Sequence, residues 1–204
     1  LNSIWSVSRK HVQTEEIVTE REMAAAIEMA AVLAGGKEAL RQRPLLSIMQ
    51  CTLSPLCQDG GSVEAALVAA RAGLPVGFMT MASCLTTGPA TPAGTLVVGN
   101  AEVLSALVLM QMASPGCPVY YAAAQTASDL RTGGYTGGGP VDYLFGAATN
   151  LLADYYHLPL SMISQTVDSV QMLEALASGN LDAIPESTSA VPGGKGIEPY
   201  QSQV

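Results

Sequence analysis

Aromatic and charged residues are scarce in this sequence, and each shortage excludes a class of protein. Only 5% of the residues are aromatic and 13% are charged, whereas 49% are hydrophobic. A chain this apolar is not intrinsically disordered, and its core must be built from Ala, Val, Leu and Met. Nine Lys and Arg stand against 17 Asp and Glu, which gives a net charge of −8 without a basic stripe. We therefore predict no nucleic-acid partner.

Residues that ligate metals are also few. The chain has two His and four Cys, and no two Cys form a C-x-x-C pair. Because no His, Cys and acidic residues fall at the spacing of a metal site, we predict no bound metal. We expect the four Cys to be free thiols in a reducing compartment, which predicts a cytoplasmic protein.

Neither a secretion signal nor a membrane span is predicted. The sequence begins at Leu1 without the basic region and apolar core of a signal peptide. It also lacks an initiator Met, so we expect it to begin inside a longer protein. The apolar stretch around residues 101–113 is interrupted by Glu102, Ser105 and Gln111, and it predicts a buried helix rather than a span.

Short apolar runs alternate with longer helical segments along the chain. A capping box at Thr19 and Glu22 predicts a first helix to about Leu33, which Gly35 and Gly36 end. The predicted strands are residues 45–51, 75–82, 118–124 and 158–163, and the helices between them are residues 63–71, 100–112 and 141–156. This alternation predicts a parallel sheet with right-handed crossovers.

The loops favour one parallel-sheet fold over another. Loops after the predicted strands are long and rich in small residues, and loops before them are short, as in a TIM barrel. A doubly wound sheet is the alternative, but no G-x-G-x-x-G motif follows a strand. We predict an α/β fold: a partial (β/α)8 TIM barrel of about four βα units over residues 1–163. A divergent helix and flexible tail are predicted for residues 164–204. Because half a barrel leaves apolar edges open, we also expect a homo-oligomer.

The predicted strand ends would bring aromatic and polar side chains to one mouth. Tyrosines attract methylated ammonium ions by cation–π interaction, with about 0.5–2 kcal/mol from each. Strand side chains alternate, so Tyr120 and Tyr121 cannot both point into the barrel, and we place Tyr121 there. The predicted substrate-binding residues are Gln50, Met81, Tyr121, Gln125, Asp129, Arg131 and Tyr135.

The charges near this mouth have two readings. Asp129 and Arg131 are the only charges between Val103 and Val141. They form either a salt bridge that anchors their own loop or a site for a substrate carboxylate or a partner protein. Glu102 is expected in the first turn of its helix, where it would complement the helix dipole. No nucleophile or catalytic triad stands out, so the catalytic residues stay unassigned and a cofactor would supply the chemistry.

Three segments resemble the trimethylamine:corrinoid methyltransferase family. They are AGGKEALR at 34–41, GTLVVGNAE at 94–102 and DLRTG at 129–133, with LLSIMQCTLSPL, GLPVGFMTM and YYHLPLSM at the matching places between and after them. The resemblance covers residues 7–162. It implies a TIM-barrel enzyme that moves a methyl group from trimethylamine, or from a quaternary amine such as glycine betaine, to Co(I). The corrinoid (cobalamin) would be carried by a cognate partner protein that docks at the strand-end loops.

The resemblance ends near Ile163, before the region where some members carry pyrrolysine, and no residue here matches that position. We therefore expect a truncated member. The alternative is an inactive remnant that only binds an amine or a partner protein. An unrelated lyase or aldolase on the same barrel would need a Schiff-base Lys or a metal set at a strand end, and the sequence offers neither.

Overall fold

Five parallel strands form the centre of the molecule. The computed structural model describes residues 1–8, 10–136 and 139–161. The strands are β1 (Val12–Glu15), β2 (Leu46–Leu53), β4 (Val76–Thr80), β6 (Val119–Ala123) and β8 (Leu160–Ser161). Their order in the sheet is their order in the chain, and every neighbouring pair is parallel. The predicted parallel α/β sheet is confirmed, with one more strand than we expected.

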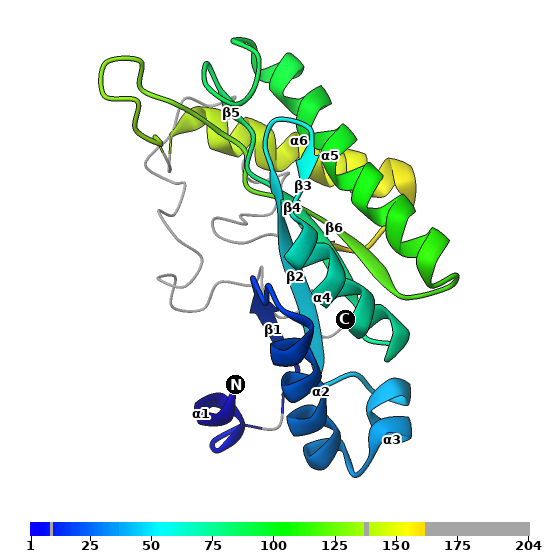
Figure 1. Ribbon diagram of the computed structural model, residues 1–204. Coiled ribbons are helices and arrows are strands. Elements are labelled where there is room, and N and C mark those ends of the chain that lie inside the picture. Colours follow the sequence, from blue (N-terminus) through cyan, green and yellow to red (C-terminus); the bar gives the residue numbers. More distant parts are fainter. Residues whose placement is uncertain (9, 137–138, 162–204) are drawn as a thin grey trace.

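The sheet is curled into a half-barrel. Ser161 Oγ on β8 donates a hydrogen bond of 2.8 Å to Gln13 Oε1 on β1, although these strands lie at opposite edges of the sheet. Such a contact requires the two edges to bend toward each other. The curl and the strand order are those of a partial TIM-like barrel, with helices outside and a concave face inside (Figure 1).

Helices cover the convex face. They are α2 (Glu20–Ala34), α4 (Gly60–Arg71), α5 (Pro92–Ala113) and α6 (Pro140–Tyr156), with the short α1 (Asn2–Trp5) and α3 (Lys37–Gln42) nearer the N-terminus. The Thr19 side chain accepts a hydrogen bond from the backbone N–H of Glu22, as the predicted capping box requires. Asp59 caps α4 by accepting a hydrogen bond of 2.8 Å from the Ser62 N–H.

The start of α5 was predicted wrongly. We expected this helix over residues 100–112, but it begins at Pro92, and its cap is Thr91, whose side chain accepts from the Gly94 N–H. Pro92 occupies the first helical position, where a missing N–H costs nothing. Residues 83–95 are rich in Gly and Pro, a composition typical of a loop. The helix start at Thr91 and Pro92 was therefore not recognised.

Two clusters of buried side chains lie on opposite faces of the sheet. The larger one joins helix residues such as Met23 and Met110 to Ile48, Phe78 and Tyr121 of the strands. The smaller one consists of strand residues alone, namely Met49, Met79, Tyr120 and Ala122. The alternation of strand side chains therefore sends one set toward the helices and the other to the concave face.

The loops after the strands are tied together by short strands. β3 (Cys57–Gln58) pairs antiparallel with the end of β2. β5 (Ser83–Cys84) and β7 (Thr126–Ala127) pair in parallel beyond β4 and β6. The helix and tail predicted for residues 164–204 lie outside the described residues.

Within the described part of the chain, α5 alone is long and apolar enough to cross a membrane, judged by length and composition. Core helices of soluble proteins pass the same test, and 39% of its most apolar window is buried. It also packs against β4 and β6. We therefore describe α5 as a barrel helix.

Candidate functional site

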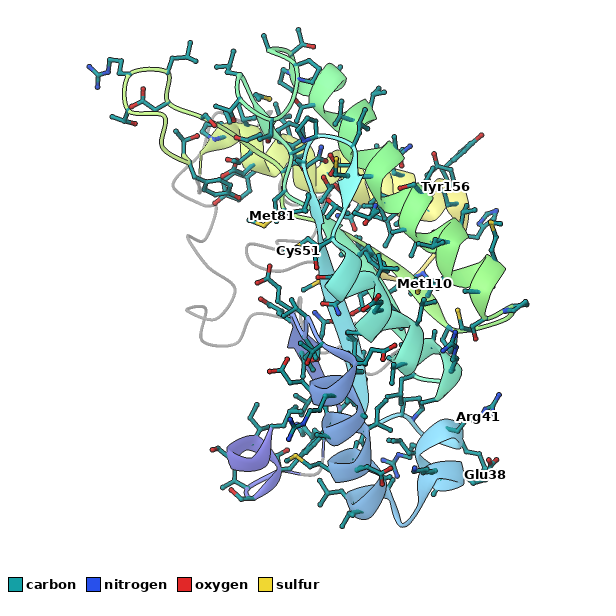
Figure 2. The ribbon with its side chains drawn as sticks, viewed as in Figure 1. Glu38, Arg41, Cys51, Met81, Met110 and Tyr156 are labelled. Atoms are coloured by element: carbon teal, nitrogen blue, oxygen red, sulfur yellow. The ribbon has the colours of Figure 1, made fainter. Side chains whose placement is uncertain are left out.

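The register of the five strands defines one shared inner surface. Residues opposite each other in a parallel pair point to the same side of the sheet. The pairs Gln13–Ser47, Cys51–Met79 and Ala122–Ser161 therefore share a side. We call this side the concave face, and it comprises Gln13, Glu15, Ser47, Met49, Cys51, Gly77, Met79, Tyr120, Ala122 and Ser161. Cys51 and Met81 lie on the side of the sheet away from Met110 and the helices (Figure 2).

Tyr120 covers the part of the concave face formed by β4 and β2. Its ring lies directly over Gly77, because a Cβ built on that glycine would sit 2.1 Å from the Tyr120 Cε2 atom. The ring thus crosses β4, and its hydroxyl donates a hydrogen bond of 2.8 Å to the Ile48 carbonyl on β2. Burial raises the pKa of the Tyr120 hydroxyl well above its ordinary value, so the group stays protonated at neutral pH.

His11 supports the same end of the sheet. One ring nitrogen lies 2.8 Å from Ser47 Oγ and the other 3.1 Å from the Pro44 carbonyl. Because these contacts occupy both nitrogens, His11 is placed to hold β1 and β2 together. It lies at the amino ends of the strands, far from the loops that follow them.

The carboxyl ends of β1 and β2 carry two acids and a thiol. Glu15 and Glu16 are exposed, and Cys51 on β2 is half-buried beside them. Burial raises the pKa of the Cys51 thiol to about 12, and a hydrogen bond to Glu16 and the two negative charges add to this effect. Cys51 is therefore a neutral thiol at neutral pH rather than a nucleophilic thiolate. We call Glu15, Glu16, Cys51, Met79 and Met81 the acidic rim.

A buried carboxylate holds the strand ends that carry the rim. Glu102 is 1% exposed, and its carboxylate accepts hydrogen bonds from the hydroxyls of Thr52, Thr80 and Ser54 at 2.7, 2.6 and 2.8 Å. A fourth bond, of 2.9 Å, comes from the Leu56 backbone N–H. Glu102 lies in the middle of α5, so the prediction that it would complement the helix dipole from the first turn was wrong. The error follows from the misplaced helix start.

Two of the predicted substrate-binding residues face the helices instead of the concave face. Gln50 is fully buried, and its amide donates to the carbonyls of Ile17 and Ser62 at 2.6 and 3.1 Å. Tyr121 is also fully buried; its hydroxyl donates to Asn100 Oδ1 at 3.0 Å, and its ring stacks on Tyr156. The alternation of strand side chains puts Tyr120 on the concave face in place of Tyr121.

Three other predicted residues lie in the segments that follow β4 and β6. Gln125 turns toward α5, where its amide donates to the Thr95 carbonyl at 2.7 Å beside Gly99. Met81 is 42% exposed at the end of β4 and belongs to the acidic rim. Tyr135 folds back over the end of β6, and its hydroxyl donates to the Ala124 carbonyl at 3.1 Å.

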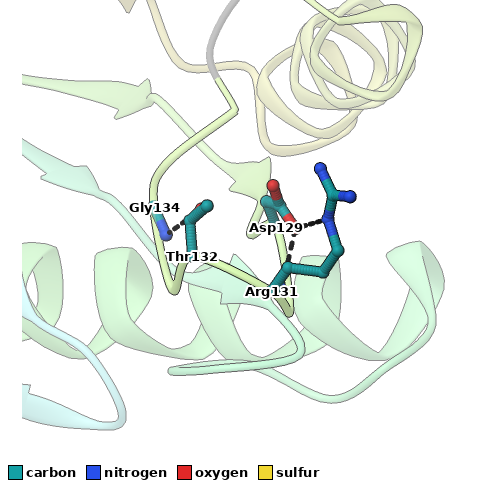
Figure 3. Close-up of polar contacts among 4 residues, drawn as sticks. All are labelled: Asp129, Arg131, Thr132 and Gly134. Atoms are coloured by element: carbon teal, nitrogen blue, oxygen red, sulfur yellow. Dashed lines mark hydrogen bonds and ion pairs between the residues drawn. The ribbon is translucent and has the colours of Figure 1, made fainter.

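Asp129 and Arg131 lie at the tip of a loop (Figure 3). Asp129 Oδ1 accepts a bond of 2.8 Å from the Arg131 backbone N–H, which makes a tight local turn. The Arg131 side chain is 89% exposed, and its Nε lies 4.0 Å from the same oxygen. An ion pair this exposed contributes little stability. The sequence left two interpretations open, an anchor for this loop and a binding site. The contacts of Asp129 are those of a residue that anchors its own loop.

The sequence analysis did not place Glu15, Glu16 or Tyr120 at the site, although the structure puts them on the concave face or the acidic rim. The four residues of β1 were too few for a recognisable alternation, so the two acids were not connected to a strand end. Within the described ranges, no three His, Cys, Asp or Glu side chains gather closely enough to hold a metal ion. The rim thus combines negative charge with polarizable sulfur, which suits a small organic cation.

Known proteins resemble this chain over most of its length. The family model described as trimethylamine methyltransferase matches residues 3–179, which extends past the end of the resemblance that we expected. A trimethylamine methyltransferase of Desulfitobacterium hafniense is 40% identical over 149 residues, 73% of this chain and 30% of that protein. A glycine betaine methyltransferase of the same species is 38% identical over 65% of this chain and 28% of its own length. A trimethylamine methyltransferase of Methanosarcina thermophila is 39% identical over 63% of this chain and 27% of its own length.

The chain therefore spans less than a third of the length of the curated relatives that it matches. The match nevertheless covers most of the chain itself, from the first helix to beyond β8. The chain belongs to the trimethylamine methyltransferase family.

Proposed function

We propose that this chain supplies part of the barrel of an enzyme that moves a methyl group from a methylated amine to the Co(I) of a corrinoid carried by a partner protein. The observation that carries the proposal is the acidic rim. Glu15 and Glu16 stand at the mouth of the concave face, and no Lys or Arg is among the residues that define that face. Relatives named for trimethylamine and for glycine betaine support a methylated amine as the substrate.

The rim would bind and orient the amine rather than react with it. The two carboxylates would attract the ammonium group, while the sulfur atoms of Met79 and Met81 would contact its methyl groups. The neutral Cys51 thiol does not compete as a methyl acceptor, because its raised pKa of about 12 keeps it protonated. The chain would thus contribute positioning of one methyl group toward the mouth.

The carboxylates should affect substrate binding more than the rate of the chemical step. The amine nitrogen loses its positive charge as the methyl group leaves, so the attraction to Glu15 and Glu16 weakens toward the transition state. An interaction of this kind lowers KM without raising kcat. Exposed carboxylates bind a cation weakly, which limits the stabilisation of the bound ground state.

The residues at the mouth fit a docked corrinoid protein. Exposed apolar side chains follow the strand ends, namely Leu56, Met81, Leu85, Leu130 and Tyr135, which are 41–70% exposed. Such side chains would be available for contact with a second protein. The corrinoid would supply the nucleophile, Co(I), and these side chains would hold its carrier protein over the concave face.

The test is methyl transfer by the natural protein that carries this chain, mixed with its corrinoid protein in the Co(I) state. Trimethylamine or glycine betaine should abolish the Co(I) absorbance. The variant Glu15→Gln/Glu16→Gln should raise KM by about 5- to 30-fold and leave kcat within about twofold, since two exposed pairs contribute about 1–2 kcal/mol. Glu38→Gln/Glu64→Gln makes the same charge change away from the rim and should leave KM unchanged. If the protein turns over none of the methylated amines, the proposal is refuted.

A further inference from the structure

One oxygen of the Glu102 carboxylate joins two neighbouring strands at the same level. Glu102 Oε2 accepts hydrogen bonds from Thr52 on β2 and Thr80 on β4, at 2.7 and 2.6 Å. Because Cys51 pairs with Met79 in the parallel register, the next residues along the two strands, Thr52 and Thr80, also lie side by side. We call Glu102, Thr52 and Thr80 the threonine junction, and all three side chains are buried. The junction therefore fixes the distance between the ends of β2 and β4.

The residues next to these threonines belong to the acidic rim. Side chains alternate along a strand, so Cys51 and Met79 point to the concave face whereas the threonines point toward α5. Thr52 Oγ1 also lies 3.4 Å from the backbone carbonyl of Met79 on the neighbouring strand. A threonine that moves would carry the adjacent rim residue with it, because the two share a backbone.

Met81, the third sulfur residue of the rim, is held from the same junction. Thr80 Oγ1 accepts a hydrogen bond of 3.3 Å from the Ala82 N–H, which closes a tight turn around Met81. The same hydroxyl donates its proton to Glu102, so both bonds form together. The Met81 side chain is 42% exposed and lies away from the helices (Figure 2). Its place on the rim therefore depends on this turn more than on packing of its own side chain.

Gly99 lets α5 approach the end of β4. It lies one helical turn before Glu102, and a Cβ on it would sit 2.8 Å from Thr80 Cγ2 and 2.4 Å from Gln125 Nε2. The helix backbone thus packs closely on the strand end. This close packing brings the Glu102 carboxylate within hydrogen-bond distance of the Thr80 hydroxyl.

The other two bonds to Glu102 hold a different segment. Ser54 and Leu56 follow the end of β2, in the turn that leads to β3, and they donate at 2.8 and 2.9 Å. Neither is next to a rim residue in the sequence. The Ser54 hydroxyl is therefore a matched control, because it bonds to the same Oε2 atom as the threonines without adjoining the rim.

Among the described residues, no Lys or Arg forms an ion pair with the buried Glu102 carboxylate. Apolar packing often stabilises a fold as well as a buried charge does, whereas the hydrogen bonds of a buried charge define one geometry. We propose that Glu102 is a positioning residue for the bound methylated amine, because its Oε2 atom sets the spacing of the rim sulfur atoms through Thr52 and Thr80. This inference rests on the function proposed for the acidic rim.

Calorimetric titration of the whole chain with tetramethylammonium tests the proposal. Thr80→Val removes the hydroxyl and keeps the branched shape. It should weaken the affinity by about 3- to 10-fold, because a shift of about 1 Å loses much of a close contact. Thr80→Ser keeps the hydroxyl and should bind like the wild type. Ser54→Ala removes a donor from the same oxygen and should also bind like the wild type, even if it lowers the urea midpoint as much as Thr80→Val does.

A second measurement follows the rim instead of the amine. Thr52→Val should speed the alkylation of Cys51 by iodoacetamide severalfold, because a displaced end of β2 exposes a thiol whose raised pKa comes mainly from burial. Thr52→Ser keeps the bond to Glu102 and should leave the rate unchanged. The exposed Cys57 is the internal reference for both variants in mass spectrometry.

If a valine variant loses its circular dichroism spectrum, Glu102→Asp decides. It keeps the charge but is too short to bond both threonines, so it should weaken the tetramethylammonium affinity as Thr80→Val does. Wild-type affinity in folded Thr80→Val, an equal loss of affinity in Ser54→Ala, or unchanged alkylation of Cys51 in Thr52→Val would each overturn the positioning role while the rim still binds the cation. A wild type that binds no tetramethylammonium would instead overturn the proposed function, and with it the role of Glu102 toward the amine.

Discussion

Replacement of Gly77 by alanine should destabilise the protein strongly, because Tyr120 lies where the new methyl group would be. The added Cβ would sit 2.1 Å from Tyr120 Cε2 and 2.4 Å from Cδ2, far inside contact distance. The ring cannot simply move aside, since its hydroxyl is bonded to the Ile48 carbonyl at 2.8 Å and the side chain is 3% exposed. Overpacking costs about 1–3 kcal/mol. The lost hydrogen bond costs about 0.5–1.5 kcal/mol more.

A smaller effect acts in the opposite direction. Alanine restricts the unfolded chain and thereby stabilises the fold by about 0.4–1 kcal/mol. The net expectation is a loss of about 0.5–4 kcal/mol in the free energy of unfolding, measured by urea denaturation and circular dichroism. Gly60→Ala is the matched control, because a Cβ there meets no atom within 4 Å. It should change the free energy of unfolding by less than about 1 kcal/mol.

A double-mutant cycle isolates the contact. In a Tyr120→Ala background the clash disappears, so Gly77→Ala should cost less than about 0.5 kcal/mol there. If Gly77→Ala is harmless in the wild type, or equally costly in both backgrounds, Tyr120 does not cross β4 on the concave face. The side assigned to every strand residue would then be in doubt.

Two further perturbations probe the groups around the rim. Glu102→Gln should lower the free energy of unfolding by about 3 kcal/mol, since bonds to a charged acceptor contribute about 1.5–3 kcal/mol each and an amide oxygen cannot accept all four. The exposed Glu64→Gln should be neutral, and equal urea midpoints would contradict the Glu102 network. Cys51 should resist iodoacetamide at pH 8 while the exposed Cys57 reacts, as read by mass spectrometry. Folding raises the pKa of the Cys51 thiol from 9.0 to about 12. The contribution of this protonated thiol to the free energy of unfolding is therefore fully present below pH 9.0 and is lost between pH 9.0 and about 12. Glu16→Gln should speed the reaction only in part, because burial is the larger cause of the raised pKa; rapid alkylation of native Cys51 would contradict the site.

Most of the fold was predictable because its signals are local. The capping box at Thr19, the apolar runs of β2, β4 and β6, and the long loops after them each follow from short stretches of sequence. β1 was missed because four residues give too little periodicity to separate a strand from a loop. The start of α5 was missed because Pro92 is as compatible with the first turn of a helix as with a loop.

The candidate site was harder to predict because it depends on which way each strand faces. A shift by one residue exchanges Tyr120 and Tyr121, and the sequence around them is apolar on both sides. The glycine at position 77 was the available signal, because a ring on the neighbouring strand needs space there. The role of Glu102 depended on hydrogen-bond partners 22–50 residues away in the sequence, which no local pattern reveals.

Calorimetric titration of the chain with tetramethylammonium tests most directly whether the acidic rim binds a methylated cation. We predict measurable binding by the wild type, a 5- to 30-fold weaker affinity for Glu15→Gln/Glu16→Gln (about 1–2 kcal/mol), and wild-type affinity for Glu38→Gln/Glu64→Gln. Equal affinity of the rim variant and the wild type would contradict the account, because the cation would then be bound somewhere other than the concave face.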